Sequence, residues 1–207
     1  MTSKEALRAA HIGRRRALSD AERQAAAKNI ALFFSGFAPF RRRSFSAYLS
    51  HDNEIPTRHL IRQILAWNAA CALPAWDPAS KAYHLFAFHA QTPLVKGPYG
   101  IREPGQRIPV SAASVRLFLI PGVAFDNAGN RVGHGKGYYD TILANASSDA
   151  IKVGVCYDWQ ITNDPIPAES HDIAMDFLLT DRRVLCCNPE KLAALSKNHS
   201  HSTQALP

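Results

Sequence analysis

One apolar run constrains the fold of this chain more than any other feature. Val115–Ile120 reads Val-Arg-Leu-Phe-Leu-Ile, and Pro121-Gly122 ends it. A nearly continuous apolar run of this length is typical of a central strand buried on both faces of a parallel sheet. Other predicted strands alternate with predicted helices along the chain. The sequence therefore predicts an α/β domain with right-handed crossovers between parallel strands.

The first part of the chain is predicted to be helical. One helix is expected over Lys4–Arg16 and a second over Asp20–Phe34. Ser19 and Glu22 fit a capping box, in which each residue bonds the other's backbone N–H, so the second helix is expected to begin after Ser19. A third helix is predicted from a Thr57 cap through Trp67.

The remaining elements follow from short apolar or alternating segments and from breaker residues. Strands are predicted over Phe45–Leu49, Cys71–Leu73 (closed by Pro74), His84–Phe88, Ile151–Tyr157 and Asp176–Thr180, and a helix over Tyr138–Ala146. Pro93–Pro109 is rich in proline and glycine and is predicted to be a long loop with a functional role.

Composition and charge narrow the class of protein. Lys and Arg number 24 against 17 Asp and Glu, a net charge of +7, which suits a nucleotide, a polyanionic small molecule or nucleic acid, although a solvated basic surface explains it equally well. No apolar run approaches the ~20 residues of a membrane span. The polar N-terminus and four cysteines without a CxxC pair predict a cytoplasmic protein with reduced, buried thiols. We expect one domain over residues 1–187 and a polar, flexible tail over 188–207.

The chemistry is concentrated in the segment Pro121–Asp140, which follows the predicted central strand and precedes a helix. Ligands of open α/β sheets bind at the carboxyl ends of strands. In Gly133–Gly137, glycines alternate with His134 and Lys136, so the backbone can bend tightly and turn its N–H groups toward an anion. The following helix adds the positive end of its dipole. Asp140 lies one turn into that helix, where it could hold a magnesium ion on the same phosphates.

Two common phosphate-binding loops do not fit this segment. Gly129 and Gly135 are separated by five residues rather than the four of a Walker loop, and Gly137 stands where Ser or Thr is required. The spacing is also GxGxG, not the GxGxxG of dinucleotide-binding domains. Nearby Asp126, Arg131 and Tyr138-Tyr139-Asp140 favour a binding site over a plain structural turn.

The segment resembles the signature of the 5-formyltetrahydrofolate cyclo-ligase family, also called methenyltetrahydrofolate synthetase. The matching residues are Pro121-Gly122, Phe125-Asp126, Gly129, Arg131, Gly133, Gly135, Gly137 and Tyr138-Tyr139-Asp140. The resemblance extends to about Asp181 and includes Lys4–Arg8, Tyr48–Glu54, Gly100–Pro104 and His171–Asp176. It implies a three-layer α/β/α sandwich with a mostly parallel central sheet.

The resemblance also implies the reaction. Members of this family use ATP and Mg²⁺ to close 5-formyltetrahydrofolate into 5,10-methenyltetrahydrofolate, with release of ADP and phosphate. Phosphorylation turns the formyl oxygen into a good leaving group, and N10 then attacks the carbon. The protein must align the γ-phosphate with the formyl oxygen and neutralise the charge between them.

Site residues are carried over by position. The expected ATP contacts are Lys4, Arg8, Arg131, Gly133, His134, Gly135, Lys136, Gly137, Tyr138 and Tyr139. The expected folate contacts are Leu49, Glu54, Trp76, Tyr99 and residues 134–138 (His134, Gly135, Lys136, Gly137, Tyr138). Arg131, Lys136 and Tyr138 are the expected catalytic residues. Asp140 and Asp176 are the expected magnesium ligands, with Asp172 as a weaker third candidate.

Two other function classes stay open from the residues alone. The net charge and the runs Arg14–Arg16 and Arg41–Arg43 suit a nucleic-acid-binding protein, but these runs are separated and not interleaved with aromatic residues. Another small-molecule phosphotransferase would suit the loop, whereas Glu54, Trp76 and Tyr99 together favour a flat heteroaromatic substrate. The expected partners are small molecules only, without nucleic acid or membrane, and the expected state is a monomer.

Overall fold

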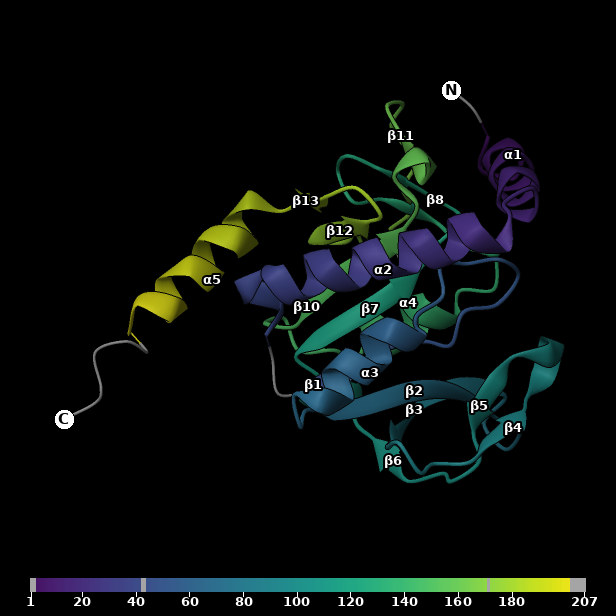
Figure 1. Cartoon of the computed structure of the whole chain (residues 1–207), viewed down its shortest axis with the longest axis vertical. Coiled ribbons are helices and arrows are strands. Elements are labelled where there is room, and N and C mark those ends of the chain that lie inside the picture. The colour runs from purple at the N-terminus through teal and green to yellow at the C-terminus, as the bar shows by residue number, and fades with distance from the viewer. Residues whose placement is uncertain (1–2, 42–43, 171, 202–207) are drawn as a thin grey trace.

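A sheet of eight strands organises the chain, whose computed structural model describes residues 3–41, 44–170 and 172–201. The strand order is β13-β12-β10-β7-β1-β2-β3-β6 (Figure 1). The sheet strands are β1 (Ser44–Ser46), β2 (Ala70–Asp77), β3 (Ala82–Phe88), β6 (Pro109–Val110), β7 (Leu117–Pro121), β10 (Ile151–Cys156), β12 (Phe177–Thr180) and β13 (Val184–Cys186). The five strands from β12 to β2 are parallel, and β13, β3 and β6 add antiparallel edges.

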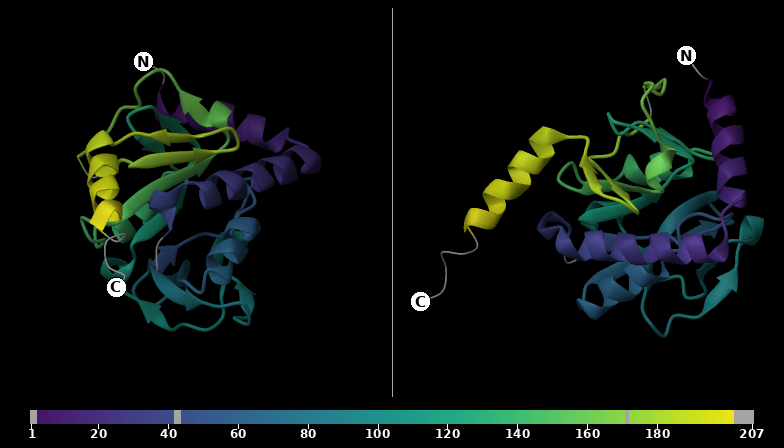
Figure 2. Two further views of the ribbon diagram at one scale, coloured as in Figure 1. Left: turned by 60° about the vertical axis from the view of Figure 1, so that its left-hand side comes forward. Right: turned by 45° about the horizontal axis from the view of Figure 1, so that its top comes forward.

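Helices cover both faces of this sheet. The helices are α1 (Lys4–Arg16), α2 (Asp20–Gly36), α3 (Arg58–Ala66), α4 (Tyr138–Leu143) and α5 (Pro189–His201). In Figures 1 and 2, α2 and α3 lie over one face, where their apolar side chains form a core cluster with alternate sheet residues. The short helix α4 packs on the opposite face with Phe118 and Ile120. The predicted α/β sandwich with a mostly parallel central sheet is confirmed.

Strand β7 lies in the middle of the core, as the apolar run predicts. Leu117 and Leu119 belong to the cluster under α2 and α3, while Phe118 and Ile120 belong to the cluster on the α4 side. All four side chains are fully buried. Since successive strand residues point to opposite faces, a strand covered on both sides needs apolar residues throughout.

Most helix boundaries agree with the sequence prediction. α1 has the predicted bounds, and α2 begins after Ser19 with both bonds of the capping box formed. Thr57 precedes α3 but does not cap it with its side chain. Its buried hydroxyl instead donates a hydrogen bond to the Tyr48 carbonyl, which ties the start of α3 to the loop after β1.

The structure differs from the sequence prediction at several places, besides β1 and α4, which end three residues earlier than predicted. β2 does not end before Pro74 but continues to Asp77. β2 pairs with β1 only as far as Ala72, so at Pro74 it has a neighbouring strand, β3, on one side only. A proline is tolerated at such a position because the backbone hydrogen bond it cannot donate is not needed on the open side. The expected loop 93–109 contains an antiparallel ribbon of β4 (Leu94–Lys96) and β5 (Arg102–Pro104), besides β6. The polar C-terminal segment forms α5, and Leu195 from α5 is buried in the core. Residues 202–207 of the expected tail lie outside the described residues.

The cysteines agree with the sequence prediction only in part. Cys71 and Cys156 are buried free thiols, whereas Cys186 and Cys187 are free thiols that are partly exposed. Burial raises the pKa of Cys71 to about 12, so this thiol is an inert apolar group at neutral pH. Within the described parts of the chain, no helix has the length and apolar character needed to cross a membrane.

The capping box of α2 yields a first test. The Ser19 Oγ accepts from the Glu22 N–H at 3.3 Å, and the Glu22 carboxylate accepts from the Ser19 N–H at 2.8 Å. Removing the hydroxyl in Ser19→Ala should lower the free energy of unfolding by about 1 kcal/mol, measured by chemical denaturation. Ser19→Thr keeps a hydroxyl and should retain most of that stability. Equal stability of Ser19→Ala and the wild type would show that the cap does not stabilise α2.

Candidate active site

A cavity of about 630 Å³ lies at the carboxyl ends of the central parallel strands. Its walls come from α1, the loop after β1, strands β2 and β3, the turn between β4 and β5, the segment after β7 and the turn containing Glu169 and Asp172. The predicted site residues that line it are Lys4, Arg8, Leu49, Glu54, Arg131, Gly133, His134, Gly135, Lys136, Gly137, Tyr138, Tyr139 and Asp140, together with Asp172. The fold thus gathers residues from four distant parts of the sequence at one place.

Glycines in the segment after β7 set its path by permitting close contacts. A Cβ on Gly122 would lie 2.4 Å from the ring of Phe125, and one on Gly154 in β10 would lie 2.5 Å from the same ring. Gly129 has a φ of +85°, and its Cβ would lie 2.3 Å from the Met175 carbonyl oxygen. These positions therefore exclude a side chain, because the ring and the backbone already occupy the space.

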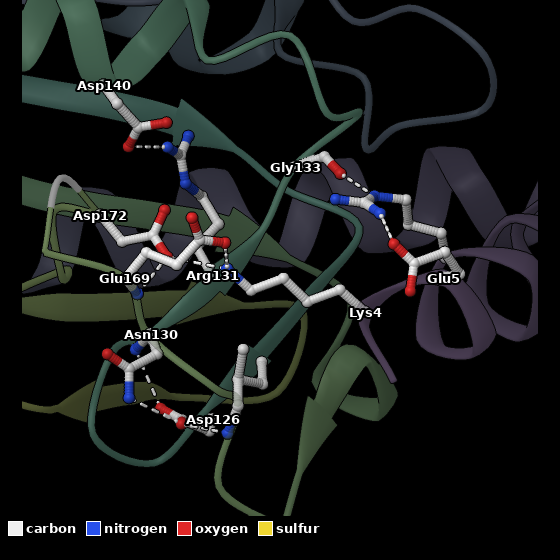
Figure 3. Close-up of polar contacts among 11 residues, drawn as sticks. Lys4, Glu5, Asp126, Asn130, Arg131, Gly133, Asp140, Glu169 and Asp172 are labelled. Atoms are coloured by element: carbon white, nitrogen blue, oxygen red, sulfur yellow. Dashed lines mark hydrogen bonds and ion pairs between the residues drawn. The ribbon is translucent and has the colours of Figure 1, made fainter. Parts of the chain in front are cut away.

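Asp126 closes the turn inside this segment rather than facing the cavity. Its buried carboxylate accepts the backbone N–H groups of Ala128, Asn130 and Ile166 at 2.9–3.0 Å, and also the Asn130 side-chain amide (Figure 3). A carboxylate with this many donors is fully used in holding backbone. This part of the signature is structural, and it presents the following strand β9 (Arg131–Val132), which pairs with β8 (Ala124–Asp126), to the cavity.

The glycine loop 133–137 lies at the mouth of the cavity and is held from α1. Arg8 donates from Nε to the Gly133 carbonyl at 2.8 Å, and Gly135 approaches the same guanidinium. Gly135 and Gly137 adopt left-handed φ values of +83° and +65°. The His134 Nε2 lies 3.8 Å from a Glu54 carboxylate oxygen, so the loop also faces the opposite wall.

Two of the cavity's cations are paired with carboxylates (Figure 3). Lys4 contacts Asp172 at 2.8 Å and Glu169 at 3.2 Å, and Arg131 contacts Asp140 at 2.6 Å. The hydrogen bond to Asp172 is the main cause that raises the pKa of Lys4, although partial burial opposes it. The cavity therefore contains both basic side chains that can bind an anion and carboxylates that can bind a metal cation.

The other half of the cavity is aromatic and includes the carboxylate of Glu54. The Tyr83 and Tyr138 rings lie 4.7 Å apart, and both line the cavity. The Glu54 side chain is only 9% exposed and accepts the His51 backbone N–H at 3.0 Å. Trp76 is predicted to contact folate, but it does not line the cavity. Its ring packs against Tyr138, with the two ring centroids 6.0 Å apart. The side chain of Tyr99, and Arg42 and Arg43 of the second basic run, lie outside the described residues.

Asp176 is not brought to the cavity, so the predicted pair Asp140 and Asp176 is not assembled there. The Asp176 carboxylate accepts from the Lys152 N–H at 2.8 Å and from the Asn188 side chain at 2.9 Å, and it is 4% exposed. It connects the start of β12 to β10 and to the residue before α5, as a strand-start cap would. Among the described residues, no group of three or more His, Cys, Asp and Glu is arranged to hold a metal by itself.

Several lining residues were not identified from the sequence. Tyr83, Ile101, Arg102 and Glu169 also line the cavity. Tyr83 lies directly opposite Trp76 in the β2–β3 strand pair. The predicted residue, Trp76, therefore belongs to the strand pair that supplies an aromatic side chain to the cavity, but Tyr83 is the residue that lines it. Ile101 and Arg102 come from the β4–β5 ribbon, whose proline-rich sequence indicated a functional segment without naming its contacts.

Comparison with known proteins finds relatives that share one family. The model of the 5-formyltetrahydrofolate cyclo-ligase family matches residues 1–181. The chain is 32% identical to the 5-formyltetrahydrofolate cyclo-ligase of Mycolicibacterium smegmatis, covering 87% of this chain and 95% of that protein. It is 32% identical to the enzyme of the same name from Escherichia coli strain K12, covering 83% and 96%. The solved 5,10-methenyltetrahydrofolate synthetase of Aquifex aeolicus has a TM-score of 0.78 at 29% identity, covering 89% and 92%.

The two kinds of glycine in the segment can be separated by stability. Gly129→Ala places a Cβ against Met175 in a left-handed backbone, so its free energy of unfolding should fall by about 2 kcal/mol or more. A Cβ on Gly133 meets nothing within 4 Å, and Gly133→Ala should change stability by less than about 0.5 kcal/mol. Chemical denaturation measures both. A Gly133→Ala loss as large as that of Gly129→Ala would contradict the description of the loop.

Proposed function

Because the chain belongs to the 5-formyltetrahydrofolate cyclo-ligase family, we propose that it converts 5-formyltetrahydrofolate and ATP to 5,10-methenyltetrahydrofolate, ADP and phosphate with the help of Mg²⁺. The observation that carries the proposal is the division of one cavity into two chemically different halves. Lys4, Arg8 and the glycine loop form a cationic half. Tyr83, Tyr138 and the carboxylate of Glu54 form an aromatic half that suits a pterin.

The proposed reaction assigns a task to each half. The γ-phosphoryl group moves from ATP to the formyl oxygen, and ADP leaves. N10 then donates its electron pair to the formyl carbon, the C–O bond breaks, phosphate departs, and N10 loses its proton. Arg131, Lys136 and the loop N–H groups neutralise the charge that develops between the phosphate and the formyl oxygen. Tyr138 lies where the two halves meet and positions the substrate against the loop.

The cavity suits a magnesium ion bound together with phosphates. Mg²⁺ is usually held by one or two carboxylates, with the remaining positions filled by phosphate oxygens and water. Asp140 meets this need in the wall next to the loop, and Asp172 lies in the opposite wall beside Lys4. When bound, the ion would neutralise charge on the transferred phosphate. Asp176, which is engaged with Lys152 and Asn188, is not part of the proposed set.

The basic charge supports small-molecule binding better than nucleic-acid binding. Lys4, Arg8 and Arg131 face the cavity rather than an open surface. Arg15 is buried, and Arg14 lies over the Trp159 ring at 4.4 Å. Arg16 is exposed but contacts Asp52, so each arginine of the run Arg14–Arg16 is already engaged within the fold. A monomeric state and a cytoplasmic location stay predictions.

The proposed activity has a direct assay. Purified protein with 5-formyltetrahydrofolate, ATP and Mg²⁺ should produce the near-ultraviolet absorbance of the methenyl product. Reactions without ATP or with excess chelator should produce none, because the formyl oxygen would remain a poor leaving group. Failure of the complete mixture, with folded protein and authentic substrate, would overturn the proposed function.

The role of Asp140 can be separated from its structural ion pair. Asp140→Asn keeps an oxygen for Arg131 but loses the charge, so Mg-ATP affinity measured by calorimetry should fall about tenfold or more. Unfolding stability should fall by only about 1 kcal/mol. Asp149→Asn, at an exposed position outside the cavity, is the matched control and should change neither property. If Asp140→Asn binds Mg-ATP normally but unfolds more easily, Asp140 is structural.

A further inference from the structure

Arg15 is a buried cation that the proposed reaction does not use directly. Its side chain is 1% exposed, in contrast to the 64% exposure of neighbouring Arg16. None of its three guanidinium nitrogens has a hydrogen-bond partner among the described residues. A guanidinium is fully charged at any physiological pH, and burying it without partners is unfavourable. A residue of this kind needs an explanation beyond the solvated basic run in which it occurs.

The charges nearest to Arg15 belong to the loop after β1. Its Nη2 lies 3.6 Å from a carboxylate oxygen of Asp52, and its Nη1 lies 4.0 Å from Oε1 of Glu54. The Tyr48 hydroxyl, also buried and without a hydrogen-bond partner, belongs to the same surroundings. Burial raises the pKa of Tyr48, Glu54 raises it further, and Arg15 opposes both. Arg15 thus lies next to the carboxylate of Glu54, which the proposed function assigns to pterin binding.

This loop needs external support because its backbone is unusual. Asp52 and Asn53 both have left-handed φ values, +46° and +58°, which non-glycine residues rarely adopt. Helices α1 and α2 hold it from one side: Arg16 contacts Asp52, and Arg23 contacts Asn53. Only Arg15 reaches Glu54 among the arginines of this group, and it does so from inside the protein.

The position of Arg15 on α1 also connects the two halves of the cavity. Lys4, Arg8 and Arg15 are separated by four and seven residues, so they lie on one face of the helix. Lys4 and Arg8 belong to the cationic half, and Arg15 faces the loop of the aromatic half. In Figures 1 and 2, α1 stands at one side of the sheet as a single straight element that leads into α2. One rigid helix thus sets the spacing between both binding regions.

Resting on the proposed function, we propose that Arg15 is a positioning residue for folate: it holds the Glu54 carboxylate in place, directed into the cavity toward the amino and N–H groups of the pterin. Arg15 touches neither substrate in this role. Its effect belongs to the binding of folate and not to phosphoryl transfer. This distinction gives it a signature that a purely structural arginine would not have.

The test compares Arg15→Met with the wild type in KM for each substrate and in equilibrium binding of 5-formyltetrahydrofolate by calorimetry. Arg15→Met should raise the KM and the dissociation constant for 5-formyltetrahydrofolate about tenfold, while KM for Mg-ATP and kcat change less than about threefold. Arg14→Met removes the same charge from the same helix outside the cavity, and it should change none of these. Arg15→Lys, which keeps a charge without the planar fork, should recover part of the folate affinity.

A double-mutant cycle identifies the group through which Arg15 acts. In a Glu54→Gln background, Arg15→Met should change folate affinity by less than about threefold, because the carboxylate it positions is no longer present. The same fold-loss in both backgrounds, or no loss in either, overturns the inference. If Arg15→Met does not fold, the cycle with Arg15→Lys gives the same two outcomes at smaller amplitude.

The wild-type measurements separate this inference from the proposed function. Wild-type protein that neither binds nor converts 5-formyltetrahydrofolate would overturn the proposed function, and the inference with it. Wild-type protein that does both, with an Arg15→Met effect independent of Glu54, would overturn the inference alone.

Discussion

The cavity depends on strand β7, which is buried on both faces and paired on both edges. β1 and β10 run parallel to it on either side, and its four apolar residues from Leu117 to Ile120 are fully buried. A strand enclosed in this way has a single register, because a shift by one residue would exchange the side chains of two differently shaped cores. Its carboxyl end at Pro121 is therefore fixed in space, and so is the point from which the glycine-rich segment leaves the sheet.

That segment combines residues that build the site with residues that act in it. Gly122, Phe125, Asp126 and Gly129 make close contacts or backbone hydrogen bonds that leave no freedom for other side chains. Residues 133–137 face the cavity and are more exposed. The rigid part holds the exposed part in place, since a loop that binds phosphate through backbone N–H groups is useful only if those groups are already aligned. A long sequence signature can thus reflect folding as much as chemistry.

Features that depend on a local sequence pattern could be predicted from the sequence. Features that depend on contacts between residues distant in sequence could not. The helix α1, the cap of α2 and the buried strand β7 follow from periodicity and from residues a few positions apart. Asp176 has the residue type of a metal ligand, but Lys152 and Asn188, which are distant from it in sequence, engage its carboxylate outside the cavity. The burial of Arg15 inside a basic run is equally invisible to local pattern, because its neighbours in sequence are exposed and its partners lie near residue 54.

The charges of the cavity fit the proposed pair of a polyanion and a divalent cation. Lys4 and Arg131 each face a carboxylate, so their like charges do not repel one another across the cavity without compensation. In the proposed reaction the phosphates of ATP would take over these cations, and Asp140 would become free for Mg²⁺. Either ligand alone would leave one member of each pair without a partner, at an energetic penalty in a partly buried site. The pairing therefore favours Mg-ATP as a unit, and the anion and the metal should each strengthen the binding of the other.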